Sequence, residues 1–186
     1  GETCYPNEIW IGDEYAEKLA RIEFPSVALR LIENPCYKDF VNDVQRQQMT
    51  CHPLRGSGKK ILFVCENIDS DGFHQDDAIR YFMSNLDALR EEVDTILIRP
   101  HPAEHIDKYT WVAEVYDENI VFSEGGTLAK DVAVSDIVVG CSTMAMALAV
   151  KAGRRVISCI PNQRYPFTLP FEQIENLSDL IKINKY

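Results

Sequence analysis

The sequence predicts an α/β protein with a doubly wound, Rossmann-like parallel sheet. Short apolar runs of strand length alternate with helical patterns over residues 60–160. The clearest unit begins with Ile137–Val139, turns at Gly140, continues as a helix-forming run to Val150 and returns to a second apolar run. Strand, tight turn, helix and strand in this order form the building unit of a parallel α/β sheet.

Five strands and four intervening helices follow from this alternation. The expected strands are Lys60–Cys65, Thr95–Ile98, Ile120–Phe122, Ile137–Val139 and the apolar run between Gly153 and Cys159. The expected helices are the run with Ile79, Phe82, Met83, Leu86 and Leu89 at helical spacing, the run with Tyr109, Val112 and Val115, the segment Leu128–Val134, and the run that ends at Val150. A tail from Asn162 is expected to end in a helix over Leu177–Ile183.

The first 58 residues have a less regular pattern. Asn7–Gly12 predicts a short strand, Asp13 a helix cap, and Val27–Ile32 a second apolar run. A helix around Val44 is expected to fade into a polar, Pro- and Gly-containing linker over residues 45–58. We therefore expect residues 1–58 to be an approach segment that packs on the main domain, residues 59–186.

Composition excludes several classes of function. A chain of 186 residues that is 46% hydrophobic and 26% charged predicts a soluble domain, and no apolar run reaches membrane-helix length. The formal charge of -10 argues against binding to nucleic acid, which requires a basic face. Six cysteines without paired metal-ligand spacing are typical of free thiols in a reducing cytoplasm.

The turn after Ile137–Val139 is the first candidate ligand site. Gly140, Ser142 and Thr143 lie where a strand ends and a helix begins, so backbone N–H groups and the helix dipole attract anions there. The two hydroxyls add donors, and we interpret the turn as a phosphate seat. A plain helix N-cap without a ligand is the alternative.

A second candidate follows the strand Thr95–Ile98. In the sequence Arg99-Pro-His-Pro102 two prolines restrict the backbone around His101. His101 is suited to donate to phosphate or ribose oxygens, and Arg99 to neutralise phosphate charge. The alternative is a strand terminator in which Arg99 pairs with a surface carboxylate. Glu66, Glu104 and His105 are assigned to solvated surface, and Asp69-Ser-Asp71 to a turn rather than a metal site.

These motifs together resemble the carboxyl-terminal, nucleotide-binding half of GT-B-fold glycosyltransferases. Arg-Pro-His-Pro after one strand, then Ser135-Asp-Ile-Val-Val-Gly-Cys-Ser-Thr143 before a small-residue helix, is similar to capsule and teichoic-acid polymerases and bacterial sialyltransferases. UDP-N-acetylglucosamine 2-epimerases share the architecture. The resemblance implies that residues 59–186 bind a nucleotide-activated sugar or polyol as substrate, without a further cofactor.

The resemblance also assigns roles to residues. His101 contacts phosphate or ribose, Ser142 and Thr143 hold phosphate, and the loop with Glu124, Gly125 and Gly126 lies near the base. The catalytic residues stay unknown, because an amino-terminal, acceptor-binding domain is missing from this chain. The acidic residue that these families often carry after the Ser pair is Ala147 here. The isolated chain is therefore expected to be inactive. The expected location is the cytoplasm or, through missing regions, the periphery of the inner membrane.

Three functions remain open. The first is the donor-binding domain of a glycosyltransferase in surface polysaccharide synthesis, with an epimerase-like domain as the enzymatic alternative. The second is a non-catalytic module that binds a nucleotide sugar, which Ala147 favours. The third is a scaffold that retains only the sheet.

Overall fold

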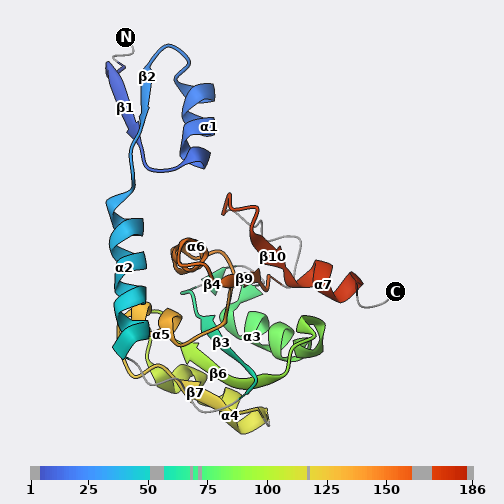
Figure 1. Ribbon diagram of the computed structural model, residues 1–186. Helices are drawn as coiled ribbons and strands as arrows, with labels where there is room; N and C mark the ends of the chain where they lie inside the picture. Colours follow the sequence, from blue (N-terminus) through green and yellow to red (C-terminus); the bar gives the residue numbers. More distant parts are fainter. Residues whose placement is uncertain are drawn as a thin grey trace. The chain divides into compact units, whose positions relative to one another are not determined.

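The computed structural model describes residues 5–50, 57–67, 69–70, 73–116, 118–160 and 169–183, in two compact units, Gly1–Phe40 and Val41–Tyr186 (Figure 1). The first unit contains β1 (Glu8–Ile11), α1 (Glu14–Glu23), β2 (Ala28–Leu31) and the start of α2 (Pro35–Thr50). The second contains β3 (Lys59–Val64), β4 (Asp69–Ser70), β5 (Phe73–His74), α3 (Gln75–Met83), η1 (Leu86–Leu89), β6 (Val93–Arg99), η2 (Ile106–Tyr109), α4 (Trp111–Val115), β7 (Ile120–Phe122), α5 (Leu128–Ala133), β8 (Ile137–Gly140), α6 (Met144–Lys151), β9 (Arg155–Ser158), β10 (Ile174–Asn176) and α7 (Leu177–Ile183).

The first unit is a strand–helix–strand element with a parallel pair of strands. β1 and β2 pair from Glu8 opposite Ala28 to Ile11 opposite Leu31. Asp13 caps α1, since its Oδ1 accepts from Tyr15 N at 3.0 Å and from Ala16 N at 2.8 Å. The predicted strand and the predicted cap are both confirmed.

The helix α2 is longer than the sequence pattern suggests. Its first residue is Pro35, whose fixed φ suits the first turn of a helix. The polar residues that follow Val44 are good helix formers, so the helix continues to Thr50 and the predicted fading at Gln45 is wrong. Along the chain, the boundary between the two compact units falls within α2, between Phe40 and Val41. A functional division at residue 58 stays a prediction.

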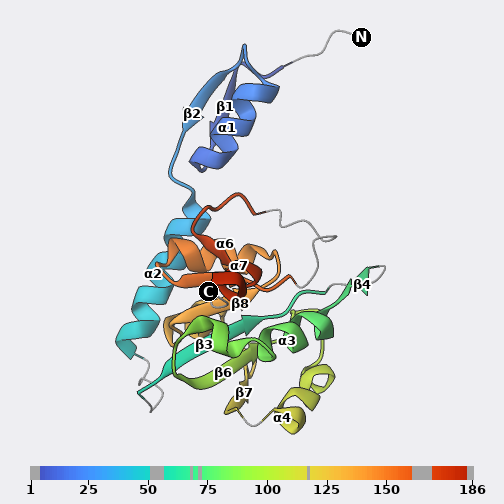
Figure 2. The ribbon, with the colours of Figure 1, turned by 90° about the vertical axis from the view of Figure 1, so that its right-hand side faces the viewer.

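The second unit contains a sheet of six described strands in the order β10-β9-β8-β3-β6-β7. Every neighbouring pair is parallel, and Figure 2 shows β3, β6 and β7 side by side. The chain runs from β3 outward to β7, returns to β8, and then runs outward to β10 on the other side. The doubly wound, Rossmann-like fold is therefore confirmed, and its topological switch point lies between β3 and β8.

Helices cover both faces of this sheet. On one face, alternate strand residues such as Ile61, Phe63 and Ile157 form a buried cluster with side chains from α3, α4 and α7. On the other face α6 approaches closely: a Cβ at Gly140 would lie 2.7 Å from Val64 Cγ2 and 3.1 Å from Met146 Sδ. Strands that are buried on both faces have continuous apolar sequences, which explains why these strands were predictable.

Two expectations about the elements are wrong. β10 was not predicted, because Ile174-Glu-Asn176 is short and polar; Arg155 of β9 holds it through two bonds to Glu175, at 2.7 and 2.9 Å. The single helix expected to reach Leu89 ends at Met83, and η1 follows after a turn. Arg90 then has a φ of 54°, a left-handed conformation that ends η1.

Candidate functional site

The strand order brings all predicted site residues to one edge of the sheet. From β8 across β3 and β6 to β7, the carboxyl ends of the strands carry the Ser142 turn, Glu66, the Pro-His-Pro loop and the loop from Ser123 to Gly126. The predicted residues therefore form two groups, after β8 and after β6 and β7. Glu66, which follows the strand between them, was not among the predicted site residues.

A pocket of about 420 Å³ lies between the loops that follow β6 and β7. Its lining includes the predicted residues Arg99, His101, Glu124 and Gly125. Pro100, Pro102, Glu104, His105, Ile106 and Ser123 complete it. The structure thus brings the two predicted loops together around one pocket, whereas the lining does not include Gly140, Ser142 or Thr143.

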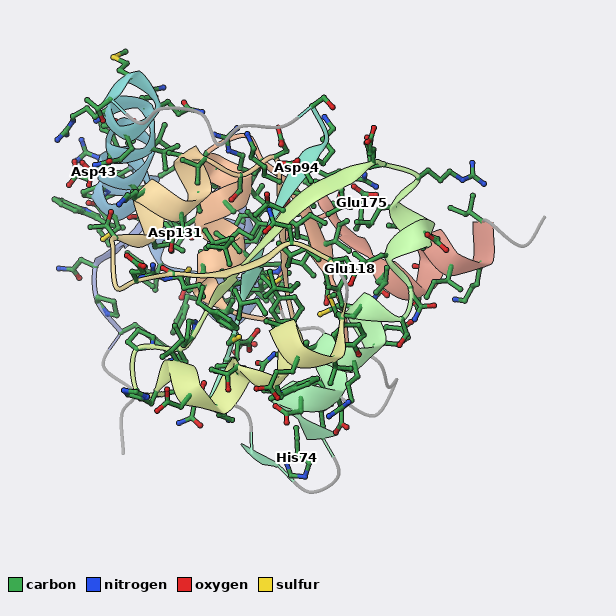
Figure 3. The ribbon with its side chains drawn as sticks, turned by 90° about the horizontal axis from the view of Figure 1, so that it is seen from below. Asp43, His74, Asp94, Glu118, Asp131 and Glu175 are labelled. Carbon is green, nitrogen blue, oxygen red and sulfur yellow. The ribbon has the colours of Figure 1, made fainter. Side chains whose placement is uncertain are left out.

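Arg99 lines this pocket and its guanidinium binds the loop that follows β7. Its Nη1 donates to Asp131 Oδ2 at 2.5 Å, to Gly126 O at 2.9 Å and to Ser123 Oγ at 3.2 Å. Asp131, on α5 and labelled in Figure 3, is buried and also accepts from Ser123 Oγ at 2.6 Å. This carboxylate neutralises the Arg99 guanidinium and holds it against the loop after β7. A direct role for Arg99 toward a phosphate stays a prediction.

His101 is half-buried and its tautomer is determined by a backbone contact. Ala103 N donates to His101 Nδ1 at 3.2 Å, so in the neutral ring the proton is on Nε2. Pro100 and Pro102 both line the pocket beside it. His101 lowers the pKa of two neighbouring carboxyl groups, those of Glu66 and Glu104. The ring is therefore a positioned donor within a predominantly acidic edge.

Glu104 forms part of a network and is not the surface residue that was expected. Its side chain is 8% exposed and contacts Lys108 Nζ at 2.6 Å as well as the hydroxyl of Tyr109. Burial raises the pKa of Glu104, but the bonds from Lys108 and Tyr109 outweigh burial and lower it below its usual value. The spacing of Glu104 and Lys108, four residues apart, was the available signal for this ion pair.

The amides of the Ser-Thr turn donate to a carboxylate of the protein itself. Cys141 N and Ser142 N donate to Glu66 Oε1 at 3.0 and 2.6 Å, and the backbone of Thr143 also bonds to this carboxylate. Thr143 caps α6, with its Oγ1 accepting from Ala145 N at 3.4 Å. Thr143 is therefore the N-cap of α6, as one interpretation of the turn expected, and a phosphate at this turn stays a prediction. The assignment of Glu66 to solvated surface is wrong.

Burial and hydrogen bonding act on Glu66 in opposite directions. Burial raises the pKa of its carboxyl group above the usual value, while the amides of Ser142, Cys141 and Thr143 and the nearby His101 lower it. The net change is an increase, because burial is the largest contribution. No local signal pointed to this contact, since Glu66 and Ser142 are 76 residues apart in the sequence.

Other candidate positions have structural roles. Gly140 is required for packing between β8 and α6, because a side chain would overlap Val64. Gly125 has a φ of 82° and open space around its Cα, so its main role is the loop conformation. Ala147, within α6, is fully buried. The predicted turn at Asp69-Ser-Asp71 includes residue 71, which lies outside the described residues.

Within the described parts of the chain, no group of His, Cys, Asp and Glu side chains has the arrangement of a metal site. None of the helices in the same parts is both long and apolar enough to cross a membrane.

Comparison with known proteins gives distant structural likeness only. No protein-family profile matches the chain, and no curated protein is significantly similar to it in sequence. One similar solved structure is the crystal structure of POFUT1 in complex with GDP, with a TM-score of 0.39 and 11% sequence identity. The match covers 78% of this chain and 58% of that chain, so the present chain spans less than two thirds of its length.

Proposed function

We propose that the unit Val41–Tyr186 binds a nucleotide-activated sugar or polyol in the pocket between the loops after β6 and β7. The pocket at the carboxyl edge of a doubly wound sheet is the observation that carries this proposal, because such sheets bind ligands at that edge. Its volume of about 420 Å³ lies in the range of small-molecule sites. The motif Arg99-Pro-His-Pro102, which lines the pocket, favours a nucleotide among small ligands.

The lining provides suitable groups for the polar parts of such a ligand. The Nε2–H of His101 is a donor for a phosphate or ribose oxygen. Glu124 and Gly125 contribute exposed backbone near the base, and Ser123 Oγ lies at the foot of the same loop. The ion pair of Arg99 and Asp131 keeps this loop in place, so the binding surface is preformed.

The proposed context is a glycosyltransferase of surface polysaccharide synthesis in which a further, amino-terminal domain binds the acceptor. The resemblance of the sequence motifs supports this context. In it, residues 1–58 link the two domains, and residues 59–186 bind the donor in the cytoplasm or at the inner membrane. A chain with only the donor site has no means to orient the acceptor, so residues 1–186 should not transfer sugar by themselves.

A non-catalytic nucleotide-sugar module is the second candidate. Two contacts favour it: Asp131 already neutralises Arg99, and Glu66 already accepts from the amides before α6. Fewer unpaired positive groups then remain to stabilise the charge that develops on a departing phosphate. Turnover by a protein that also contains the acceptor domain would distinguish a transferase from a binding module.

Isothermal titration with CMP, CDP and UDP tests the proposal. At least one nucleotide should bind, and His101→Ala should weaken it by about tenfold or more, since a hydrogen bond to a charged group contributes about 1.5–3 kcal/mol. His74→Asn is the matched control, because His74 is exposed at the start of α3, well apart from Asp131 in Figure 3. Equal affinity in both variants, or no binding of any nucleotide, would contradict the proposal.

A further inference from the structure

The switch point of the sheet, where doubly wound folds commonly bind ligands, contains an internal anion. The loop after β3 and the loop after β8 meet there, and the Glu66 carboxylate lies on the amides of Cys141, Ser142 and Thr143. These three backbone N–H groups precede or begin α6, a helix of eight residues. Without the Glu66 carboxylate these N–H groups would be able to donate to an external oxyanion.

A buried residue of α3, Gln75, holds the partly buried Glu66 in this position. Gln75, 1% exposed at the start of α3, accepts from Glu66 N through its Oε1 at 2.7 Å. The Nε2 of the same amide is buried and has no acceptor among the described residues. Gln75 therefore holds the backbone of Glu66, and its remaining donor has no partner among the described residues.

We infer that Glu66 is a specificity-determining residue that excludes phosphate from the amides before α6 and directs the ligand phosphate to His101. The inference deepens the proposed function and rests on it for the identity of the ligand. Exclusion has two causes. The carboxylate accepts the hydrogen bonds that a phosphate would need, and a second anion next to it would face a repulsion that partial burial strengthens. His101, near Glu66 on the side of β6, is the adjacent donor that remains for phosphate.

The geometry makes Glu66 an effective competitor. It belongs to the same chain and its backbone is fixed, so its carboxylate has a high effective concentration at the amides. Glu66→Ala should therefore convert the turn from a closed position into an anion seat. Glu66→Gln should open it less, because the side-chain amide keeps an oxygen acceptor while losing the charge.

The test is a titration of the full chain with inorganic phosphate, followed by NMR at the backbone amides of Cys141 and Ser142. In the unchanged chain these amides should hardly shift. In Glu66→Ala they should shift and saturate, with phosphate binding about tenfold tighter or more, which corresponds to about 1.4 kcal/mol. Glu118→Ala is the control for overall charge: Glu118 is exposed and precedes β7, at the opposite edge of the sheet.

Thermal unfolding gives a second readout if Glu66→Ala is destabilised. Phosphate should raise the melting temperature of this variant more than that of the unchanged chain, because only the folded variant binds it at the seat. Equal shifts of Cys141 and Ser142 in the unchanged chain and in Glu66→Ala would overturn the inference, as would their absence from both. Because the probe is phosphate and the readout local, a failure to bind nucleotides would refute the proposed function and leave this result intact.

Discussion

Replacement of Asp131 by Ala should destabilise the unit Val41–Tyr186 substantially. Asp131 Oδ2 accepts from Arg99 Nη1 at 2.5 Å and from Ser123 Oγ at 2.6 Å, and the two charged side chains are only 9% and 20% exposed. Removing one partner of a buried ion pair costs about 3–5 kcal/mol. Arg99 keeps the oxygens of Ser123 and Gly126, so we expect the low end, about 3 kcal/mol.

Urea unfolding, monitored by tryptophan fluorescence, measures this loss of stability in the unit Val41–Tyr186. The chain has two tryptophans, and in a Trp10→Phe background the signal comes from Trp111, within Val41–Tyr186. The midpoint should fall at an unchanged m-value. The control is Asp179→Ala, which removes an exposed ion pair with Lys182 and should cost no more than about 0.5 kcal/mol.

Asp131→Ala leaves the buried charge of Arg99 without a partner, and a double substitution tests whether this charge causes the loss of stability. Arg99→Met combined with Asp131→Leu removes both charges and should recover most of the stability, because apolar residues often replace a buried ion pair without loss. A loss below about 1 kcal/mol in Asp131→Ala, or a double variant no more stable than the single one, would refute the reasoning.

Two further predictions concern the switch point. Gly140→Ala should cost about 1–3 kcal/mol, because its Cβ would lie 2.7 Å from Val64 Cγ2 in a packed core; Gly126→Ala, whose Cβ would meet only the flexible Lys130 side chain at 3.3 Å, is the control. Burial raises the pKa of the Glu66 carboxyl group in the folded chain. The stability that protonated Glu66 contributes is therefore present below about pH 4.5 and is lost as the pH rises from there through the folded pKa. Over this rise in pH, the unchanged chain should lose stability relative to Glu66→Gln.

Urea unfolding measures both. Equal stabilities of Gly140→Ala and Gly126→Ala would show that Val64 of β3 and Met146 of α6 can move aside without cost. A stability difference between the unchanged chain and Glu66→Gln that stays constant, or grows in favour of the unchanged chain with rising pH, would contradict the direction of the Glu66 pKa change.

The fold could be predicted because its central strands contain continuous apolar runs. Residues 61–65 and 137–139 are buried on both faces of the sheet, so their apolar composition alone predicted strands. β10 lacks this signal, because an edge strand of three residues is held by the distant pair Arg155 and Glu175. The end of α3 at Met83 was hidden because Leu86 and Leu89 continue the helical spacing within a 3₁₀ turn.

The part of the candidate site that could be predicted is the set of loops at the carboxyl ends of the strands. Arg99, His101, Glu124 and Gly125 line one pocket, as expected for loops at the same edge of a parallel sheet. The partners of their polar groups were not predictable. Asp131 has the appearance of an ordinary helix residue, and Glu66 contacts a turn 75 residues away, so both contacts exist only after the sheet has formed.

The crystal structure of the chain with bound CDP tests the central claim most directly. A phosphate oxygen should lie within about 3 Å of His101 Nε2, between the loops after β6 and β7, while Glu66 remains on the amides of Cys141 and Ser142. A phosphate on those two amides with Glu66 displaced, or a nucleotide bound outside the pocket, would contradict it.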